Sequence, residues 1–181
     1  MMEIQSSNEF RTWATGFSGC DGGNRHGAIW FCGIEYGGNE DEQSFCFSDV
    51  SEPAHLSADQ LESTLAKSQY MQKVAKSYAV LHGSEPSNYY QIALARKLFD
   101  EESDTFKINL FPISFHNDSD ELWQKWLYER TGLPTKSLYR AWCQLYRFPK
   151  MKQWVCEGNP KVIVATGTSY YEIRSVGDHK P

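Results

Sequence analysis

Three short, almost entirely apolar runs constrain the fold of this chain more than any other feature of its sequence. They are AIWFCGIE at residues 28–35, FKINLFPI at 106–113 and KVIVATG at 161–167. A strand that is buried on both faces has this composition, because it shows no polar face to water. Long segments with helical spacing separate the runs, as the crossovers of a parallel sheet require. We therefore expect an α/β protein, a three-layer α/β/α sandwich with a short central parallel sheet.

Helical patterns fill the segments between these runs. The longest is expected at 57–82, where Ser57 and Gln60 have the spacing of a capping box. The other helices are expected at residues 8–15, from Pro86 onward, at 120–130, and at 135–157 with a break at Pro149. Residues 17–27 are expected to form a glycine-rich loop. No repeat or linker interrupts the pattern, so we expect one domain over residues 1–181.

Composition excludes several classes of protein. Aromatic residues make up 14% of the chain, too many for a disordered protein. No apolar stretch approaches the roughly 18 residues of a membrane span, and the N-terminus does not resemble a secretory signal. The five cysteines are scattered without a CxxC pair, which disfavours a disulfide framework or a zinc site. We expect a cytoplasmic, monomeric protein with no metal and no cofactor.

Basic residues gather in the last third of the chain. Residues 1–124 carry a net charge of −11, whereas residues 125–181 carry +6. The basic residues Lys125, Arg130, Lys136, Arg140, Arg147, Lys150, Lys152 and Lys161 are interleaved with Trp123, Trp126, Tyr139, Trp142, Tyr146 and Trp154. Two interpretations remain open: a surface that binds the phosphates of a nucleic acid, or the solvated faces of two amphipathic helices.

Ligand sites in parallel sheets lie beyond the carboxyl ends of the strands. The first run ends in Glu35, a candidate general base that could orient a water, or else a residue that caps a helix or pairs with a lysine. Gly37 and Gly38 follow it and would let a phosphate approach the backbone closely. Phe45 and Phe47 come next, and one of them could stack on a base unless both belong to the core.

Further candidates lie inside the second run and in the loops that follow the second and third runs. Asn109 offers the donor and the acceptor that reading a nucleobase edge requires, or else is an amide satisfied within the core. His116 could donate to a developing anion, or be an ordinary loop histidine. Thr168 and Ser169 could bind phosphate at a helix N-terminus, or simply cap that helix. Asp21 in the glycine-rich loop is either a second acid or a turn former.

Together these segments resemble the uracil-DNA glycosylase superfamily over residues 28–170. The family motif G-x-[D/N/E]-P-[Y/G] is similar to the run from Gly33 to Gly37, with Tyr36 in place of proline. The base-reading asparagine of the family is similar to Asn109. The third motif, P-K-V-I-V-A-x-G, matches PKVIVATG. The last edge strand and the H-P-S loop of the family have no counterpart here, so we expect the domain to lack that strand and to be incomplete at its C-terminus.

The resemblance implies a DNA glycosylase that hydrolyses the N-glycosidic bond of a damaged or modified base after base flipping. It implies catalytic roles for Glu35 and His116. Substrate binding would fall to Asn109, Phe45, Phe47 and Tyr36, and phosphate binding to Gly37, Gly38, Thr168 and Ser169. The partner would be DNA that contains such a base, of the phage type among the possibilities, in repair or antiviral defence.

Two other functions remain open. The first is a non-catalytic nucleic-acid-binding module on the same fold, which salt-dependent DNA binding without base release would indicate. The second is a hydrolase of free nucleotides, with which the net charge of −5 is compatible. Activity on mononucleotides, with no effect of DNA strands, would indicate the second.

Overall fold

A small mixed sheet lies at the centre of the computed structural model, which describes residues 5–20, 22–35, 37–38, 40–48, 50–115 and 119–166. Its strands are β1 (Gly22–Gly23), β2 (Ile29–Gly33), β3 (Thr105–Asn109) and β4 (Val162–Ala165), in the order β1-β3-β2-β4. β2 pairs in parallel with both β3 and β4. The predicted α/β class and the parallel pairing of the three apolar runs are therefore confirmed.

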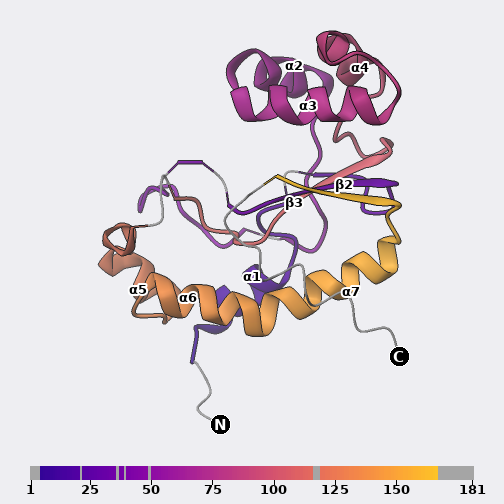
Figure 1. The fold of residues 1–181 in the computed structure, drawn as a ribbon. Coiled ribbons are helices and arrows are strands. Elements are labelled where there is room, and N and C mark those ends of the chain that lie inside the picture. The colour runs from indigo at the N-terminus through magenta and orange to yellow at the C-terminus, as the bar shows by residue number, and fades with distance from the viewer. Residues whose placement is uncertain are drawn as a thin grey trace.

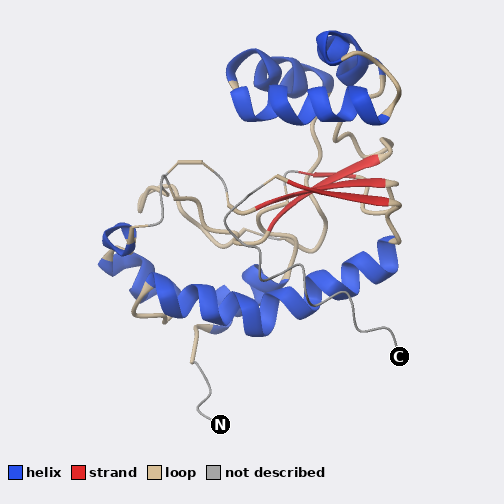
Figure 2. Cartoon of the chain, in the orientation of Figure 1, coloured by secondary structure: helices blue, strands red, loops and turns tan. Residues whose placement is uncertain are grey.

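Helices cover both faces of this sheet (Figure 1). One layer holds α2 (Ala58–Lys67), α3 (Gln69–Leu81) and α4 (Tyr89–Ala95), and the other holds α1 (Asn8–Thr15), α5 (Lys125–Thr131), α6 (Lys136–Trp142) and α7 (Phe148–Gly158) (Figure 2). Side chains alternate between the two layers along each strand. Phe31 packs in the core beneath α2, α3 and α4, whereas Trp30 and Phe106 pack against Trp154 of α7.

The first departure from expectation is β1, which lies where a loop was predicted. It pairs antiparallel with β3, so the sheet is mixed and not purely parallel. Gly22 and Gly23 have φ angles of +113° and +99°, which residues with a Cβ rarely adopt. A Cβ on Gly22 would also collide with the backbone of Ala54. Two consecutive glycines do not carry the apolar pattern of a strand, so sequence periodicity could not show this one.

The second departure concerns β4, which is not a strand buried on both faces. Val162 and Ile163 are 39% and 47% exposed. In the described part of the chain β4 pairs only with β2, at the edge of the sheet. The prediction of a buried strand at 161–167 was therefore wrong about burial, because an apolar run indicates a strand but not its place in the sheet.

The long helix predicted at 57–82 is two helices. The capping box is confirmed, since the Ser57 N–H donates to Gln60 Oε1 and the Gln60 N–H donates to Ser57 Oγ. The chain then leaves helical geometry at Ser68, whose hydroxyl accepts from the Met71 N–H and caps α3. A short 3₁₀ turn at Pro86–Asn88 leads into α4.

The predicted break at Pro149 is replaced by a widened turn. Residues Cys143–Arg147 form a π-helical turn between α6 and α7, so the chain stays helical through Pro149. Proline has no N–H to donate and its ring crowds the carbonyl four residues earlier, and a widened turn accommodates both effects. The helix predicted at 120–130 is a 3₁₀ turn at Asp120–Leu122 followed by α5.

Arg147, at the end of this π turn, is completely buried and connects three segments. Its guanidinium donates to the backbone oxygens of Asn109 and Leu110 at the end of β3. It also donates to the backbone oxygens of Ala14 and Ser18, at 2.6 Å each. Arg147 thus holds the carboxyl end of β3 against the chain that follows α1.

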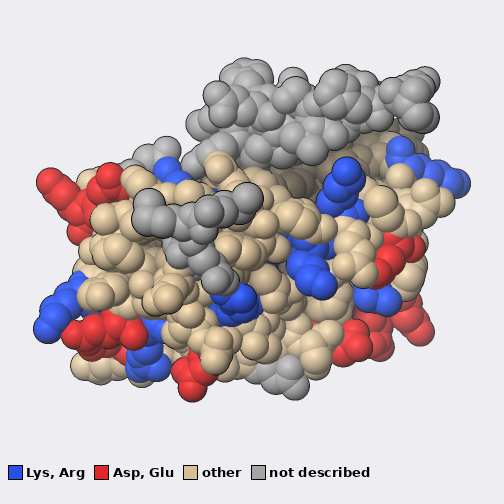
Figure 3. Space-filling model, turned by 90° about the horizontal axis from the view of Figure 1, so that it is seen from below, with Lys and Arg blue, Asp and Glu red and all other residues tan. Residues whose placement is uncertain are grey.

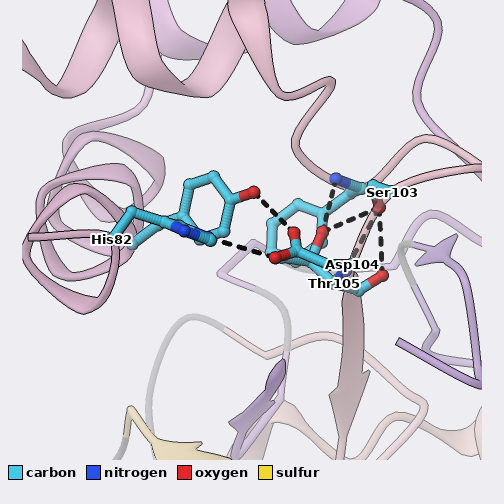
Figure 4. Close-up of polar contacts among 6 residues, drawn as sticks. His82, Ser103, Asp104 and Thr105 are labelled. Carbon is cyan, nitrogen blue, oxygen red and sulfur yellow. Dashed lines mark hydrogen bonds and ion pairs between the residues drawn. The ribbon is translucent and has the colours of Figure 1, made fainter. Parts of the chain in front are cut away.

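A second polar group fixes the opposite end of β3 (Figure 4). The Tyr78 hydroxyl donates to Asp104 Oδ1 at 2.6 Å, and His82 Nε2 lies 3.1 Å from Asp104 Oδ2. Burial and the adjacent carboxylate raise the pKa of the Tyr78 phenol. The hydroxyls of Ser103 and Thr105 bond to each other at 2.9 Å. These contacts join α3 to the amino end of β3, the end away from ligand sites in parallel sheets, so we assign them a structural role.

No helix in the described ranges combines the length and the apolar character that crossing a bilayer requires.

Candidate functional site

A cavity of about 710 Å³ lies where β2 and β3 end, between the sheet and the helices α2 and α3. Its volume falls in the range of roughly 300–1,000 Å³ that small-molecule sites occupy. The residues that line it are Cys20, Glu35, Gly37, Ala54, His55, Leu56, Gln60, Thr64, Ser68, Tyr70, Met71, Lys107 and Asn109. The structure therefore brings three of the predicted site residues, Glu35, Gly37 and Asn109, to one cavity at the carboxyl ends of parallel strands.

Asn109 has an unsatisfied amide in the cavity wall. Its side chain is only 2% exposed, and its Nδ2 is buried without a hydrogen-bond partner in the described part of the chain. A buried amide without a partner costs roughly 1–3 kcal/mol, so native proteins retain few such groups. The alternative of an amide satisfied by the core does not describe this residue. A ligand that accepts a hydrogen bond from Nδ2 would remove the cost.

Gly33 makes room for this amide. A Cβ on Gly33 would collide with Asn109 Oδ1, whereas a Cβ on Gly37 would meet no atom within 4 Å. Gly33 is paired directly with Asn109 in the parallel ladder between β2 and β3. The glycine that ends β2 is thus fixed by the side chain that ends β3.

We expect Gly33→Ala to displace the Asn109 amide and to lower the free energy of unfolding by about 1–3 kcal/mol, the usual effect of overpacking. Urea denaturation measures the loss. Gly37→Ala is the matched control and should leave stability within about 0.5 kcal/mol of the wild type. Equal effects of the two substitutions would show that Asn109 does not need this space.

Glu35 lines the same cavity and is held by a cation from the other layer. Its Oε2 lies 3.7 Å from a guanidinium nitrogen of Arg140 on α6, and both side chains are mostly buried. The Arg140 guanidinium also lies 5.5 Å from the centre of the Phe111 ring. The predicted alternative was a pairing with a lysine, whereas the partner is an arginine, and this contact fixes a carboxylate at the edge of the cavity.

Lys107 is a residue of the site that the sequence prediction missed. It is 4% exposed, two positions before Asn109 on β3, and it lines the same cavity. Its Nζ lies 5.1 Å from the centre of the Tyr70 ring. Desolvation lowers the pKa of its amine to about 8, opposed by the nearby Cys20. A lysine inside an otherwise apolar strand, in phase with Asn109, was the signal that could have identified it.

The lowered pKa of Lys107 predicts how stability depends on pH. Between about pH 8 and 10.5 the unfolded chain binds this proton more tightly than the folded one, so stability rises with pH across that window. Below pH 8 the amine is protonated in both states, and its burial then destabilises the folded protein by up to about 3 kcal/mol. We measure the urea midpoint of the wild type and of Lys107→Met at pH 7.5 and at pH 10. The midpoint of the wild type should rise more between these two pH values than that of Lys107→Met. Parallel pH profiles would contradict the burial of a charged amine.

Tyr70 is a second residue that the sequence prediction missed. Its hydroxyl and Thr166 Oγ1 form a hydrogen bond of 2.9 Å, which joins α3 to the end of β4. The residue is 37% exposed and lines the cavity, so an aromatic side chain is accessible there. Burial of the hydroxyl raises its pKa.

The thiols near the site are not nucleophiles at neutral pH. Burial raises the pKa of Cys20 to about 12 and that of Cys32 to about 11, so both remain protonated. Within the described ranges, no group of three or more His, Cys, Asp or Glu residues is arranged to hold a metal ion.

Phe45 and Phe47 do not line this cavity. Phe45 is 7% exposed and lies 5.3 Å from Phe47 and 5.3 Å from Trp126, measured between ring centres. Phe47 lies 5.3 Å from Trp13. Phe45 belongs to the aromatic core between α1 and α5, and the half-buried Phe47 packs against that core, so neither is available to stack on a base in this cavity. Alternating aromatic residues just after a site loop indicate packing as readily as binding, and here they pack.

Other predicted site residues divide into two groups. Gly37 lines the cavity, and Gly38 has a φ of +128°, where an added Cβ would meet no atom within 4 Å. Tyr36, His116, Thr168, Ser169 and Asp21 lie outside the described residues.

The basic segment at residues 125–161 exposes fewer of its cations than its sequence indicates. Lys136 and Arg147 are fully buried, and Arg140 pairs with Glu35. The aromatic residues interleaved with them are largely buried too. On the face seen in Figure 3, lysines and arginines are scattered from edge to edge, and acidic groups lie among them toward both sides. The helices of this segment also lie on the opposite side of the sheet from α2 and α3 (Figure 1).

Comparison with protein-family models, with curated proteins and with solved structures returns no match for this chain.

Proposed function

We propose that this protein is a DNA glycosylase that removes a damaged or modified base, with a fold of the uracil-DNA glycosylase type. The observation that supports this most is the buried, unpartnered Nδ2 of Asn109 in the wall of a cavity that the carboxylate of Glu35 also lines. An amide that reads an acceptor and a carboxylate beside it are the two groups that removing a base requires.

In this proposal Asn109 reads the edge of the base. Its Oδ1 lies against Gly33, so Nδ2 is the atom left to donate to a carbonyl oxygen or ring nitrogen of the ligand. Tyr70 takes the place of Phe45 and Phe47 as the aromatic side chain on which the base packs. A base can reach these groups only after it has left the duplex stack, at a cost that is lowest for damaged or weakly paired bases.

Glu35 supplies negative charge beside the sugar. Breaking the N-glycosidic bond builds positive charge on the sugar ring, and a fixed carboxylate stabilises it while orienting the attacking water. The contact with Arg140 fixes the carboxylate in position before substrate binds. The volume of the cavity admits a base that carries an added group, so we place modified bases, those of the phage type included, among the candidate substrates.

A panel of oligonucleotides tests the proposal, each with one altered base, among them uracil, an oxidised purine and glucosylated hydroxymethylcytosine. Each is offered single-stranded and in a duplex, and alkali-labile abasic sites are measured. We expect at least one altered base to be released and the unmodified control to remain intact. Release from none of them would contradict the proposal, and hydrolysis of mononucleotides alone would favour the nucleotide hydrolase.

A second hollow favours one rival function, a nucleic-acid-binding module. This more open cavity of about 1020 Å³ is lined by parts of α1, α5 and α7, including Arg11, Arg130 and Lys150 respectively. These cations could bind phosphates in the layer opposite the first cavity. Salt-dependent DNA binding that Lys150→Gln weakens, without base release by any oligonucleotide of the panel, would support this function over the glycosylase.

A further inference from the structure

The cavity wall contains an amine that the proposed base removal does not use. Lys107 and Asn109 lie two positions apart on β3, so their side chains leave the same face of the sheet. Both line the cavity, and Lys107 Nζ lies near the ring of Tyr70. A sugar whose base is read by Asn109 and packed on Tyr70 would therefore be bound close to this amine.

We propose that Lys107 is a nucleophile that forms an imine with an aldehyde bound in this cavity, namely the C1′ aldehyde of an abasic sugar. The inference rests on the proposed function for the source of that aldehyde, because base removal leaves C1′ in equilibrium with its open-chain form. The lone pair of Nζ attacks the carbonyl carbon, and both protons of the nitrogen pass to the oxygen, which leaves as water. One C=O bond is exchanged for one C=N bond, and no oxidant or reductant takes part.

The surroundings of Lys107 favour the neutral amine that this step needs. Desolvation lowers its pKa to about 8, which makes the neutral fraction at pH 7 roughly 300-fold larger than that of an exposed lysine. Desolvation of this kind activates nucleophilic lysines. The sulfur of Cys20, also in the wall, stays protonated because burial raises its pKa to about 12.

Trapping with borohydride tests this directly. The full chain is mixed with an oligonucleotide that carries a preformed abasic site, and sodium borohydride reduces any imine to a stable secondary amine. We expect a covalent protein–DNA complex whose peptide masses place the adduct on Lys107. Lys107→Arg should lose the complex, and the matched control Lys73→Arg, on the exposed face of α3, should keep it.

No complex, or a complex whose adducts map only to other amines, would overturn the inference. The peptide map comes from the wild-type protein, so the result stands even where Lys107→Arg fails to fold. The preformed abasic site bypasses base removal, so this outcome is independent of the oligonucleotide panel. If bases are released but no adduct forms, the role of Lys107 is contradicted and the proposed glycosylase function is not. If an adduct forms but no base is released, the proposed glycosylase function is contradicted and the role of Lys107 is not.

Discussion

Replacing Arg147 with methionine is expected to lower the free energy of unfolding by about 3–5 kcal/mol, the largest change in stability that we predict for a single substitution. Methionine fills a similar volume but donates no hydrogen bond. The backbone oxygens of Ala14, Ser18, Asn109 and Leu110 would each lose a buried donor. Each unsatisfied buried acceptor costs about 1–3 kcal/mol, reduced where water can enter.

Urea denaturation of the purified variants measures this loss. Arg25→Met is the matched control, because Arg25 is 39% exposed and its contact with Glu157 is 4.0 Å long. Surface ion pairs of that kind contribute about 0–1 kcal/mol. Arg147→Lys keeps the charge but not the fork of donors, and should fall between the wild type and Arg147→Met. A loss for Arg147→Met no larger than that for Arg25→Met would contradict the assigned role.

The largest effect on rate is expected from Glu35→Gln, which should slow base release by about 10²–10⁴-fold, the range for loss of a positioned acid–base group. Glutamine has the shape of glutamate but no negative charge, so it can neither stabilise positive charge on the sugar nor accept a proton from water. The measurement is single-turnover formation of abasic sites on the base that the panel identifies.

Glu42→Gln is the control for this substitution. Glu42, like Glu35, lies in the segment that follows β2, but its side chain is exposed. Thermal unfolding of both variants separates a loss of chemistry from a loss of fold, since Glu35→Gln also weakens the contact with Arg140. An unchanged rate in a folded Glu35→Gln protein would remove Glu35 from the mechanism.

Sequence reasoning succeeded where one physical pattern decides the outcome. The apolar runs predicted β2, β3 and β4 and their parallel pairing, and Ser57 with Gln60 predicted the start of α2. The rule that sites lie at the carboxyl ends of parallel strands placed Glu35 and Asn109 beside one cavity. Each of these predictions depends on local composition or on chain order, and a single sequence contains both.

The failures depend on contacts between distant segments. Phe45 belongs to the core because Trp13 and Trp126 surround it, and no local pattern distinguishes a packed aromatic residue from an accessible one. Arg147 was predicted to lie either on a phosphate-binding surface or on a solvated helix face, whereas it is buried and its partners are carbonyls of segments far from it in sequence. The site role of Lys107 depends on Tyr70, which comes from a helix in another layer.

The most direct test of the site follows the side-chain amide of Asn109 by NMR. The protein carries ¹⁵N-labelled asparagine and the Glu35→Gln substitution, which slows turnover of the bound substrate, and Asn109→Asp assigns the cross-peak by its disappearance. Each altered oligonucleotide of the panel is added in turn, with its unmodified counterpart as control. We predict that the Nδ2 cross-peak of Asn109 moves with the base that is released and stays in place with the unmodified strand. A cross-peak that no oligonucleotide moves, while asparagines elsewhere respond to the same DNA, would show that DNA binds this protein without entering the cavity.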